Sequence, residues 1–147
     1  MIFADSSAVV KLYMAESESS FVKTFTHFYV SSIAKVECIS AFWRKSSLQH
    51  IGVEEARRTS MRFTSDLNNA EKFKVFPITD EIVDLACVLL EKYRLRAYDA
   101  MQLAHAVNLN RIAQGDEPVE FLSFDKKLNI AARQEGLRLV LQRHFLN

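Results

Sequence analysis

The sequence contains few residues that interrupt helices and few cysteines. Only three glycines and two prolines occur among its 147 residues, which favours a helix-rich fold with short connections. The two cysteines, Cys38 and Cys87, are too few for a disulfide framework. Both lie in apolar stretches, so we interpret them as small core residues of a protein from a reducing compartment.

Long apolar runs and an excess of one charge are also absent. The longest stretches without Asp, Glu, Lys or Arg are residues 24–34 and 100–110, eleven residues each, whereas a transmembrane helix needs about twenty. No basic segment followed by an apolar one begins the sequence, so we expect a cytoplasmic protein that binds no membrane. The formal net charge of +1 excludes a protein that coats nucleic acid through bulk charge, and any such contact must come from a local patch.

What is present is an ordinary globular composition, with 49% hydrophobic and 25% charged residues. The length predicts a single domain, residues 1–147. We predict strands at residues 1–4, 29–30, 74–78, 119–124 and 138–141, and a turn at residues 114–118. We predict helices at residues 7–14, 17–28, 33–48, 53–73, 80–93, 97–113 and 126–135. The N-caps that we expect are Ser6 or Ser7 for the first of these helices, Ser31 or Ser32 for the third, and Thr79 for the fifth. This alternation predicts an α/β fold with a parallel sheet and helices on both of its faces.

Two carboxylates directly follow predicted strands. Asp5 comes after MIFA, and Asp125 comes after VEFLSF. Because sites in open parallel sheets form beyond the carboxyl ends of the strands, both are candidates for a shared site. Each could instead cap the helix that follows it. The first helix, however, has two serines that could cap it without Asp5.

Two further acids interrupt apolar helical stretches. Glu37 lies between Val36 and Cys38, too far from the start of its helix to complete a capping box. Its alternative interpretation is an exposed surface residue. Asp99 lies in the first turn of the predicted helix 97–113, where the helix dipole alone would favour an acid. Its neighbours are nevertheless apolar or small, as expected of a buried stretch.

Clustered carboxylates need a cation. At about 4 Å a pair of them repels by several kcal/mol even at a protein-like dielectric constant. Ligation by oxygen atoms alone suits Mg²⁺ or Mn²⁺. Zinc is disfavoured because the histidines are scattered and no Cys–His spacing matches a zinc motif; they are His27, His50, His105 and His144.

Four segments resemble, in order, the four acidic motifs of PIN-domain proteins. They are DSSAVVKLY, AKVECISAFWR, LRAYDAMQLAHA and FLSFDKKLNIAARQEGL. The resemblance spans nearly the whole chain and is greatest to the VapC-type toxins of toxin–antitoxin pairs. It implies a three-layer PIN-like fold, in which helices flank a short parallel sheet of about four or five strands. One departure is SESS after LYMAE, where the family often carries Gly or Pro.

The resemblance also implies a ribonuclease. The activity would be a Mg²⁺- or Mn²⁺-dependent endoribonuclease that hydrolyses RNA phosphodiester bonds. The family's catalytic and metal-binding acids fall on Asp5, Glu37, Asp99 and Asp125. Supporting roles fall on Ser6, beside the first acid, and on Ser123, two residues before the last. As for partners, the resemblance implies a small antitoxin protein and a homodimer.

Basic residues close to the motifs are candidates for RNA contacts, because RNA must be drawn to a site ringed by acids. They are Lys11, Arg44, Lys45, Lys126 and Lys127. A solvated surface position is the alternative for each of them. Single-stranded or looped RNA is the easier target, since its bases are free to splay and stack.

Other interpretations of the acids are weaker. A phosphoacceptor receiver domain would need an acidic pair near the end of the first strand and a lysine after the last. A haloacid-dehalogenase-type phosphatase would need a second aspartate where Ser7 stands. A PIN-like module that binds RNA or a partner protein without cutting stays open. A metal-dependent cleavage assay on mixed RNA would separate it from a nuclease.

Overall fold

Five parallel strands form one sheet at the centre of the molecule. The computed structural model describes residues 1–113 and 115–141, and within these ranges the strand order is β3-β2-β1-β4-β5. Neighbouring strands all pair in parallel. The strands are β1 (Ile2–Ala4), β2 (Phe28–Ser31), β3 (Phe73–Phe76), β4 (Glu120–Leu122) and β5 (Arg138–Leu139). The predicted α/β fold, with a parallel sheet of four or five strands, is confirmed.

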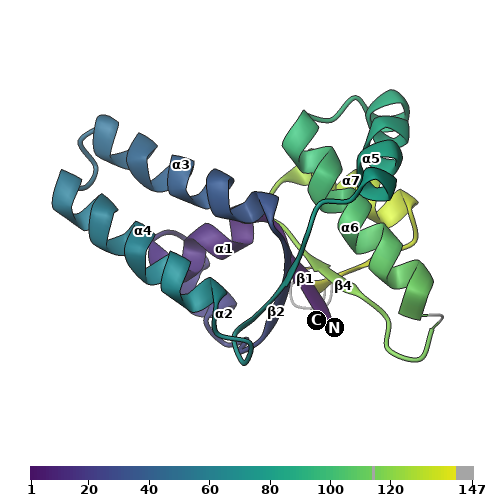
Figure 1. Cartoon of the computed structure of the whole chain (residues 1–147), viewed down its shortest axis with the longest axis horizontal. Helices are drawn as coiled ribbons and strands as arrows, with labels where there is room; N and C mark the ends of the chain where they lie inside the picture. Colours follow the sequence, from purple (N-terminus) through teal and green to yellow (C-terminus); the bar gives the residue numbers. More distant parts are fainter. Residues whose placement is uncertain (114, 142–147) are drawn as a thin grey trace.

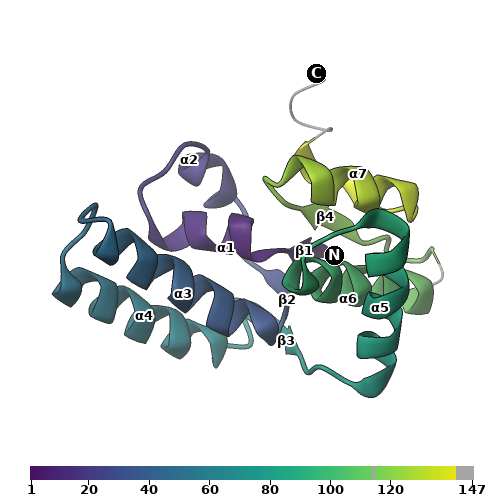
Figure 2. The ribbon, with the colours of Figure 1, turned by 90° about the horizontal axis from the view of Figure 1, so that it is seen from above.

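Helices cover both faces of this sheet (Figure 1). Those within the described ranges are α1 (Ser6–Tyr13), α2 (Ser19–Val22), α3 (Ile33–Ser47), α4 (Val53–Leu67), α5 (Asp80–Tyr93), α6 (Ala97–Ala113) and α7 (Lys126–Gln134). Helices α1 to α4 lie on one side of the sheet and α5 to α7 on the other, as the view from above also shows (Figure 2). None of the described helices has the length and apolar character needed to cross a membrane.

The order of the strands reverses at β1. From there β2 and β3 extend the sheet in one direction, whereas β4 pairs with the opposite edge of β1. A reversal of this kind opens a crevice at the carboxyl ends of the two strands. Here the backbone N–H of Asp5, after β1, donates to the carbonyl of Leu122, at the end of β4 (3.1 Å). The fold therefore brings together two chain segments that the sequence predicted to share a site.

Alternate residues of the central strands pack on opposite faces, as a period of two requires. Phe3 and Phe121 belong to the core beneath α5, α6 and α7, with their rings stacked 6.2 Å apart. Ala4 and Leu122, the next residue on each strand, belong to the core beneath α1, α3 and α4. All four are fully buried. These two cores fix the helices that carry the acidic residues.

The segment between α1 and β2 is less helical than predicted. The helix expected at residues 17–28 is reduced to α2, and Phe28 begins β2 instead. Phe28 pairs in register with Phe73 of β3. Pairing in the sheet thus overrides the helical spacing of Phe21, Phe25 and Phe28, because a short run of apolar residues fits either element.

Helix α4 ends at Leu67, whereas the sequence predicted a helix as far as Phe73. The side chain of Asn69 accepts a hydrogen bond from the backbone N–H of Glu71 (3.0 Å). Such local bonds compete with the helix and favour a turn. Phe73 then begins β3 rather than ending the helix.

A few smaller predictions also need correction. Cys38 is buried as predicted, but Cys87 is exposed on α5, so its predicted core position is wrong. Strands β4 and β5 end two residues earlier than predicted. Gln114 of the predicted turn and His144 lie outside the described residues.

Candidate active site

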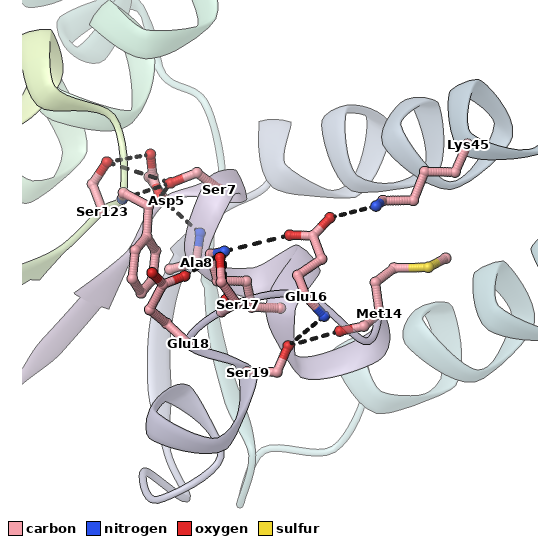
Figure 3. Close-up of polar contacts among 12 residues, drawn as sticks. Asp5, Ser7, Ala8, Met14, Glu16, Ser17, Glu18, Ser19, Lys45 and Ser123 are labelled. Carbon is pink, nitrogen blue, oxygen red and sulfur yellow. Dashed lines mark hydrogen bonds and ion pairs between the residues drawn. The ribbon is translucent and has the colours of Figure 1, made fainter. Parts of the chain in front are cut away.

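Asp5 lies at the carboxyl end of β1, where hydrogen-bond donors surround its carboxylate (Figure 3). Ser7 Oγ donates to Oδ1 (2.6 Å), and Ser123 Oγ donates to Oδ2 (2.7 Å). The backbone N–H of Ala8 also donates to Oδ1 (3.0 Å), which makes Asp5 the N-cap of α1. The predicted caps, Ser6 and Ser7, are therefore wrong. Asp5 is 3% exposed and is both a helix cap and a candidate site residue.

The charge of Asp5 has no positive partner in these contacts. Burial raises the pKa of its carboxyl from 3.8 to about 6. The negative charge of Asp99 acts in the same direction, whereas the three hydrogen bonds oppose the rise in pKa. Each donor is a neutral hydroxyl or amide, whereas buried charges in proteins are as a rule paired with an opposite charge or bound to a metal ion. A cation beside Asp5 would supply that charge.

Glu37 reaches the same region from α3. Gln102 Nε2, from α6, donates to Glu37 Oε1 (3.0 Å). Burial raises the pKa of the Glu37 carboxyl from 4.5 to about 7, and the charges of Asp99 and Asp5 raise it too. Hydrogen bonds from Gln102 and Ser6 oppose this rise. The expectation of an exposed surface glutamate is therefore set aside, because Glu37 is half-buried among other acids.

Asp99 and Asp125 complete the acidic group. Asp99 stands in the first turn of α6, and burial raises the pKa of its carboxyl, with a further contribution from Asp125. Asp125 caps α7, since its Oδ1 accepts from the backbone N–H of Leu128 (2.8 Å). Arg96 bridges the two acids: its guanidinium lies 3.2 Å from Asp99 Oδ2 and 3.6 Å from Asp125 Oδ2. Within the described ranges, Arg96 is the basic residue that forms an ion pair with both carboxylates.

All four predicted acids line one cleft of about 640 Å³. The cleft opens at the carboxyl ends of β1 and β4 and is walled by residues of α1, α3 and α6. The other polar residues that line it are Ser6, Ser7, Lys11, Glu16, Ser40, Arg44, Arg96 and Tyr98. Residues that are far apart in sequence thus meet at the crevice where this sheet topology places its sites.

The donors in the cleft fit a hard divalent cation. The described residues that line it offer carboxylate and hydroxyl oxygens, with no Cys or His among them, which suits Mg²⁺ or Mn²⁺ better than zinc. A cation would also relieve the repulsion among Asp5, Glu37 and Asp99. As arranged here, no three His, Cys, Asp or Glu side chains of the described chain converge as a complete metal site would. Arg96 instead pairs with the Oδ2 atoms of Asp99 and Asp125.

Two of the predicted RNA-contact residues are engaged in ion pairs within the protein. Lys11 is buried, and its ammonium lies 3.1 Å from Glu18 and 3.5 Å from Glu16, above the ring of Phe124. Lys45 of α3 pairs with the other oxygen of Glu16 (2.6 Å). Figure 3 shows Glu16 between helices α1 and α3. These lysines therefore fix the loop after α1 against α3, and their charges are already compensated.

The other predicted RNA-contact residues differ in position. Arg44 is exposed and lines the cleft two turns after Glu37 on α3. Lys126 and Lys127 are exposed at the start of α7 but are not among the residues that line the cleft. Lys127 donates to the backbone carbonyl of Arg94 (2.5 Å). Of these three, Arg44 is the one that lines the cleft, whereas the charge of Lys127 acts on Asp99 and opposes the rise that burial causes in the pKa of its carboxyl.

Three residues of the site were not predicted from the sequence. Ser7 donates to Asp5, Gln102 donates to Glu37, and Arg96 pairs with two of the acids. Gln102 and Arg96 each stand three residues from an acid on or beside α6, which is the spacing of neighbours on one helix face. That spacing is the signal that would have found them.

Comparison with known proteins decides the family. The family model of the PIN domain matches residues 2–134. The chain belongs to the PIN-domain family. All four acids of the cleft lie within the matched region, and the resemblance that the four motifs predicted is confirmed.

Individual relatives agree with this assignment. Ribonuclease VapC46 of Mycobacterium tuberculosis (strain ATCC 25618 / H37Rv) is 29% identical over 143 residues, which cover 95% of this PIN-domain chain and 95% of the relative. A solved toxin–antitoxin complex from Klebsiella pneumoniae is similar in fold, with a TM-score of 0.57 and 19% identity over 86% of this chain and 88% of that one. The crystal structure of Mycobacterium tuberculosis VapC20, a sarcin–ricin loop cleaving toxin, gives a TM-score of 0.62 and 14% identity over 89% of this chain and 95% of that one. At these identities the two structures bear on the fold.

Proposed function

We propose that this PIN-domain protein is a divalent-metal-dependent endoribonuclease and the toxin of a toxin–antitoxin pair. The observation that carries the proposal is the meeting of the four acids in one cleft at the ends of β1 and β4. These acids are far apart in sequence, and their electrostatic repulsion has no structural benefit of its own. Similarity to a named ribonuclease over nearly the full length of both chains supports the same reaction.

Each acid has a proposed role. Asp5, Asp99 and Asp125 would hold a Mg²⁺ or Mn²⁺ ion directly or through water, and Glu37 would hold a second ion or a water molecule. When bound, such an ion lowers the pKa of a water molecule and neutralises negative charge on the phosphate. Asp5 is suited to a fixed ligand, because it is buried and its orientation is set by Ser7 and Ser123.

The chain itself supplies positive charge for the RNA backbone. Arg44 and Arg96 line the cleft beside the acids and are exposed. Either guanidinium can contact phosphate oxygens in a bidentate manner. Lys126 and Lys127 would extend this basic track along the start of α7. Single-stranded or looped RNA remains the expected substrate.

The biological setting follows from the relatives. We propose a small cognate antitoxin as the protein partner, because one similar fold was solved as a toxin–antitoxin complex. We also propose a two-fold homodimer, the commonest symmetric assembly, and a single nuclease domain over residues 1–147 that acts on RNA in the cytoplasm.

The test is digestion of a mixed RNA by the purified chain. We expect cleavage with Mg²⁺ or Mn²⁺ and none with EDTA. Because water would attack the phosphate, the products should lack the 2′,3′-cyclic phosphate that attack by the ribose hydroxyl leaves. A chain that binds RNA but leaves it intact under all these conditions would instead be a non-cleaving PIN-like binding module.

A further inference from the structure

Gln102 is a buried polar side chain to which the proposed chemistry gives no role. It lies on α6 three residues after Asp99, so the two side chains share one face of the helix. Gln102 is only 1% exposed, and glutamine is seldom buried so completely. A buried amide needs hydrogen-bond partners, and the partners that it has both line the acidic cleft.

One nitrogen atom of Gln102 joins residues from two other helices. Its Nε2 donates to Ser6 Oγ of α1 (2.8 Å) and to Glu37 Oε1 of α3 (3.0 Å). An amide nitrogen carries two hydrogens, so both bonds form at once. Ser6 directly follows Asp5, and α6 itself carries Asp99. This one side chain therefore links the segments that hold three of the four acids.

The orientation of the Gln102 amide is fixed by its neighbours. Turning it over would place Oε1 against the carboxylate of Glu37, where two acceptors would repel each other. As it stands, Oε1 has no hydrogen-bond partner among the described residues, and a buried unsatisfied oxygen destabilises the fold. Methionine would fill nearly the same space without that oxygen. The amide nitrogen is thus the part of the Gln102 side chain that forms hydrogen bonds with the site.

We propose that Gln102 is a positioning residue that holds Glu37 and Ser6 in the arrangement needed to bind the divalent cation. The inference rests on the proposed function, because it requires Glu37 to hold that cation directly or through water. The bond to Oε1 limits rotation of the Glu37 carboxylate, and the bond to Ser6 ties the start of α1 to the same nitrogen. Removing a side chain that orients a metal ligand from behind commonly weakens metal binding by ~10–100-fold.

The test measures binding of Mn²⁺ alone to the full chain by calorimetry, without RNA. Gln102→Met keeps the length of the side chain and removes the donor, and we expect the dissociation constant for Mn²⁺ to rise by about 10- to 100-fold. Gln102→Asn keeps the amide but draws it back by one methylene, and it should weaken binding in the same direction. The matched control is Val107→Ala, a buried position on α6 outside the cleft, which should leave Mn²⁺ affinity unchanged.

A double-mutant cycle distinguishes positioning from a general effect on the fold. In a Glu37→Ala background, Gln102→Met should change Mn²⁺ affinity by less than about twofold, because the carboxylate that Gln102 orients is gone. Equal losses in both backgrounds would overturn the proposal. Wild-type Mn²⁺ affinity in both Gln102 variants would do so as well.

Two controls complete the experiment. Circular dichroism checks that each variant is folded, and Gln102→Asn carries the comparison if Gln102→Met does not fold. A parent chain that binds Mn²⁺ and cleaves RNA, beside unaffected Gln102 variants, would overturn this inference and leave the proposed function standing. A parent chain that neither binds Mn²⁺ nor cleaves RNA would overturn both.

Discussion

Replacing Asp5 with asparagine separates its charge from its role as a helix cap. Asparagine has nearly the same shape, and its Oδ1 can still accept from Ser7 Oγ and from the Ala8 N–H. Only the atom that faces Ser123 changes from acceptor to donor, and the serine hydroxyl can turn to accept. Asparagine also caps helices about as well as aspartate. Asp5→Asn therefore removes the negative charge and little else.

The size of the effect follows from the pKa of Asp5. Because the pKa rises from 3.8 to about 6 in the folded protein, ionisation of Asp5 removes ~3 kcal/mol from the free energy of unfolding. This stability is present below about pH 4 and is lost as the pH rises through about 6. At pH 7.5 the metal-free Asp5→Asn protein avoids the loss, so we expect it to melt higher than its parent by up to ~6–12 °C. Near pH 4.5, closer to the ordinary pKa of 3.8, this difference in melting temperature should shrink to about a third of its value at pH 7.5.

Melting curves followed by circular dichroism, in EDTA at pH 4.5 and 7.5, measure the stability difference. The same curves with Mn²⁺ measure the response to metal, which stabilises the parent by ~2.7 kcal/mol at a concentration one hundred times the dissociation constant. The Asp5→Asn protein should gain much less stability from Mn²⁺. Its RNA cleavage should fall by at least ~100-fold, equivalent to ~2.7 kcal/mol of transition-state stabilisation.

A role for Asp5 as a cap alone makes the opposite prediction. Stability, metal response and cleavage would then all survive the change to asparagine, because the cap is preserved. A fully active Asp5→Asn enzyme would refute the assignment of Asp5 to the metal site. A metal-free variant that melts well below its parent at pH 7.5 would refute the argument from its uncompensated charge.

Further predictions concern the cations of the cleft and the partner. Arg44→Ala should weaken RNA binding and reduce its salt dependence by about one released counterion. Lys45→Ala should have a smaller effect, because Lys45 is paired with Glu16. Fluorescence anisotropy over a salt series measures both variants, and equal effects would contradict this distinction. Arg96→Ala frees the two acids with which Arg96 pairs, Asp99 and Asp125. It should tighten Mn²⁺ binding by ~1.5- to 5-fold, the range expected from the loss of an exposed ion pair. Weaker Mn²⁺ binding in calorimetry would show that Arg96 does not compete with the cation. Purified from its native host, the chain should bring down a small protein, and recovery of a free chain that is harmless when overproduced would exclude the toxin assignment.

Much of the fold could be predicted because local patterns and tertiary structure agree. Helix α6 has the predicted bounds, since Ala97 to Ala113 lacks Gly and Pro. The helices that were predicted too long are those of the two segments before strands, 17–28 and 53–73. In the first, the phenylalanines fit a helix by spacing, and pairing between Phe28 and Phe73 in the sheet decides otherwise. In the second, α4 ends at Leu67 before the local turn that Asn69 forms. Strand pairing joins residues far apart in the chain, which no local pattern contains.

The acids of the cleft could be predicted better than their surroundings. Asp5 and Asp125 follow strands, and parallel strands gather their carboxyl ends at one edge. The partners of the acids depend on side chains that meet only in the folded protein. Gln102 of α6 donates a hydrogen bond to Glu37 of α3. Lys11 contacts the loop after α1 instead of the four acids. Nearness to a motif in the sequence therefore made Arg44 and Lys11 equal candidates for RNA contacts. In the folded protein Arg44 is exposed, whereas Lys11 is buried.

The most direct test of the central claim is cleavage of an end-labelled RNA by the parent chain and by Asp99→Asn across a Mn²⁺ titration. Asp99 lines the cleft beside the other three acids, and asparagine keeps its shape. We predict cleavage by the parent that rises with Mn²⁺ and disappears in EDTA, and a loss of at least ~100-fold in the variant at every Mn²⁺ concentration. Cleavage that persists in EDTA, or equal rates for the two proteins, would contradict a metal-dependent nuclease site built on these acids.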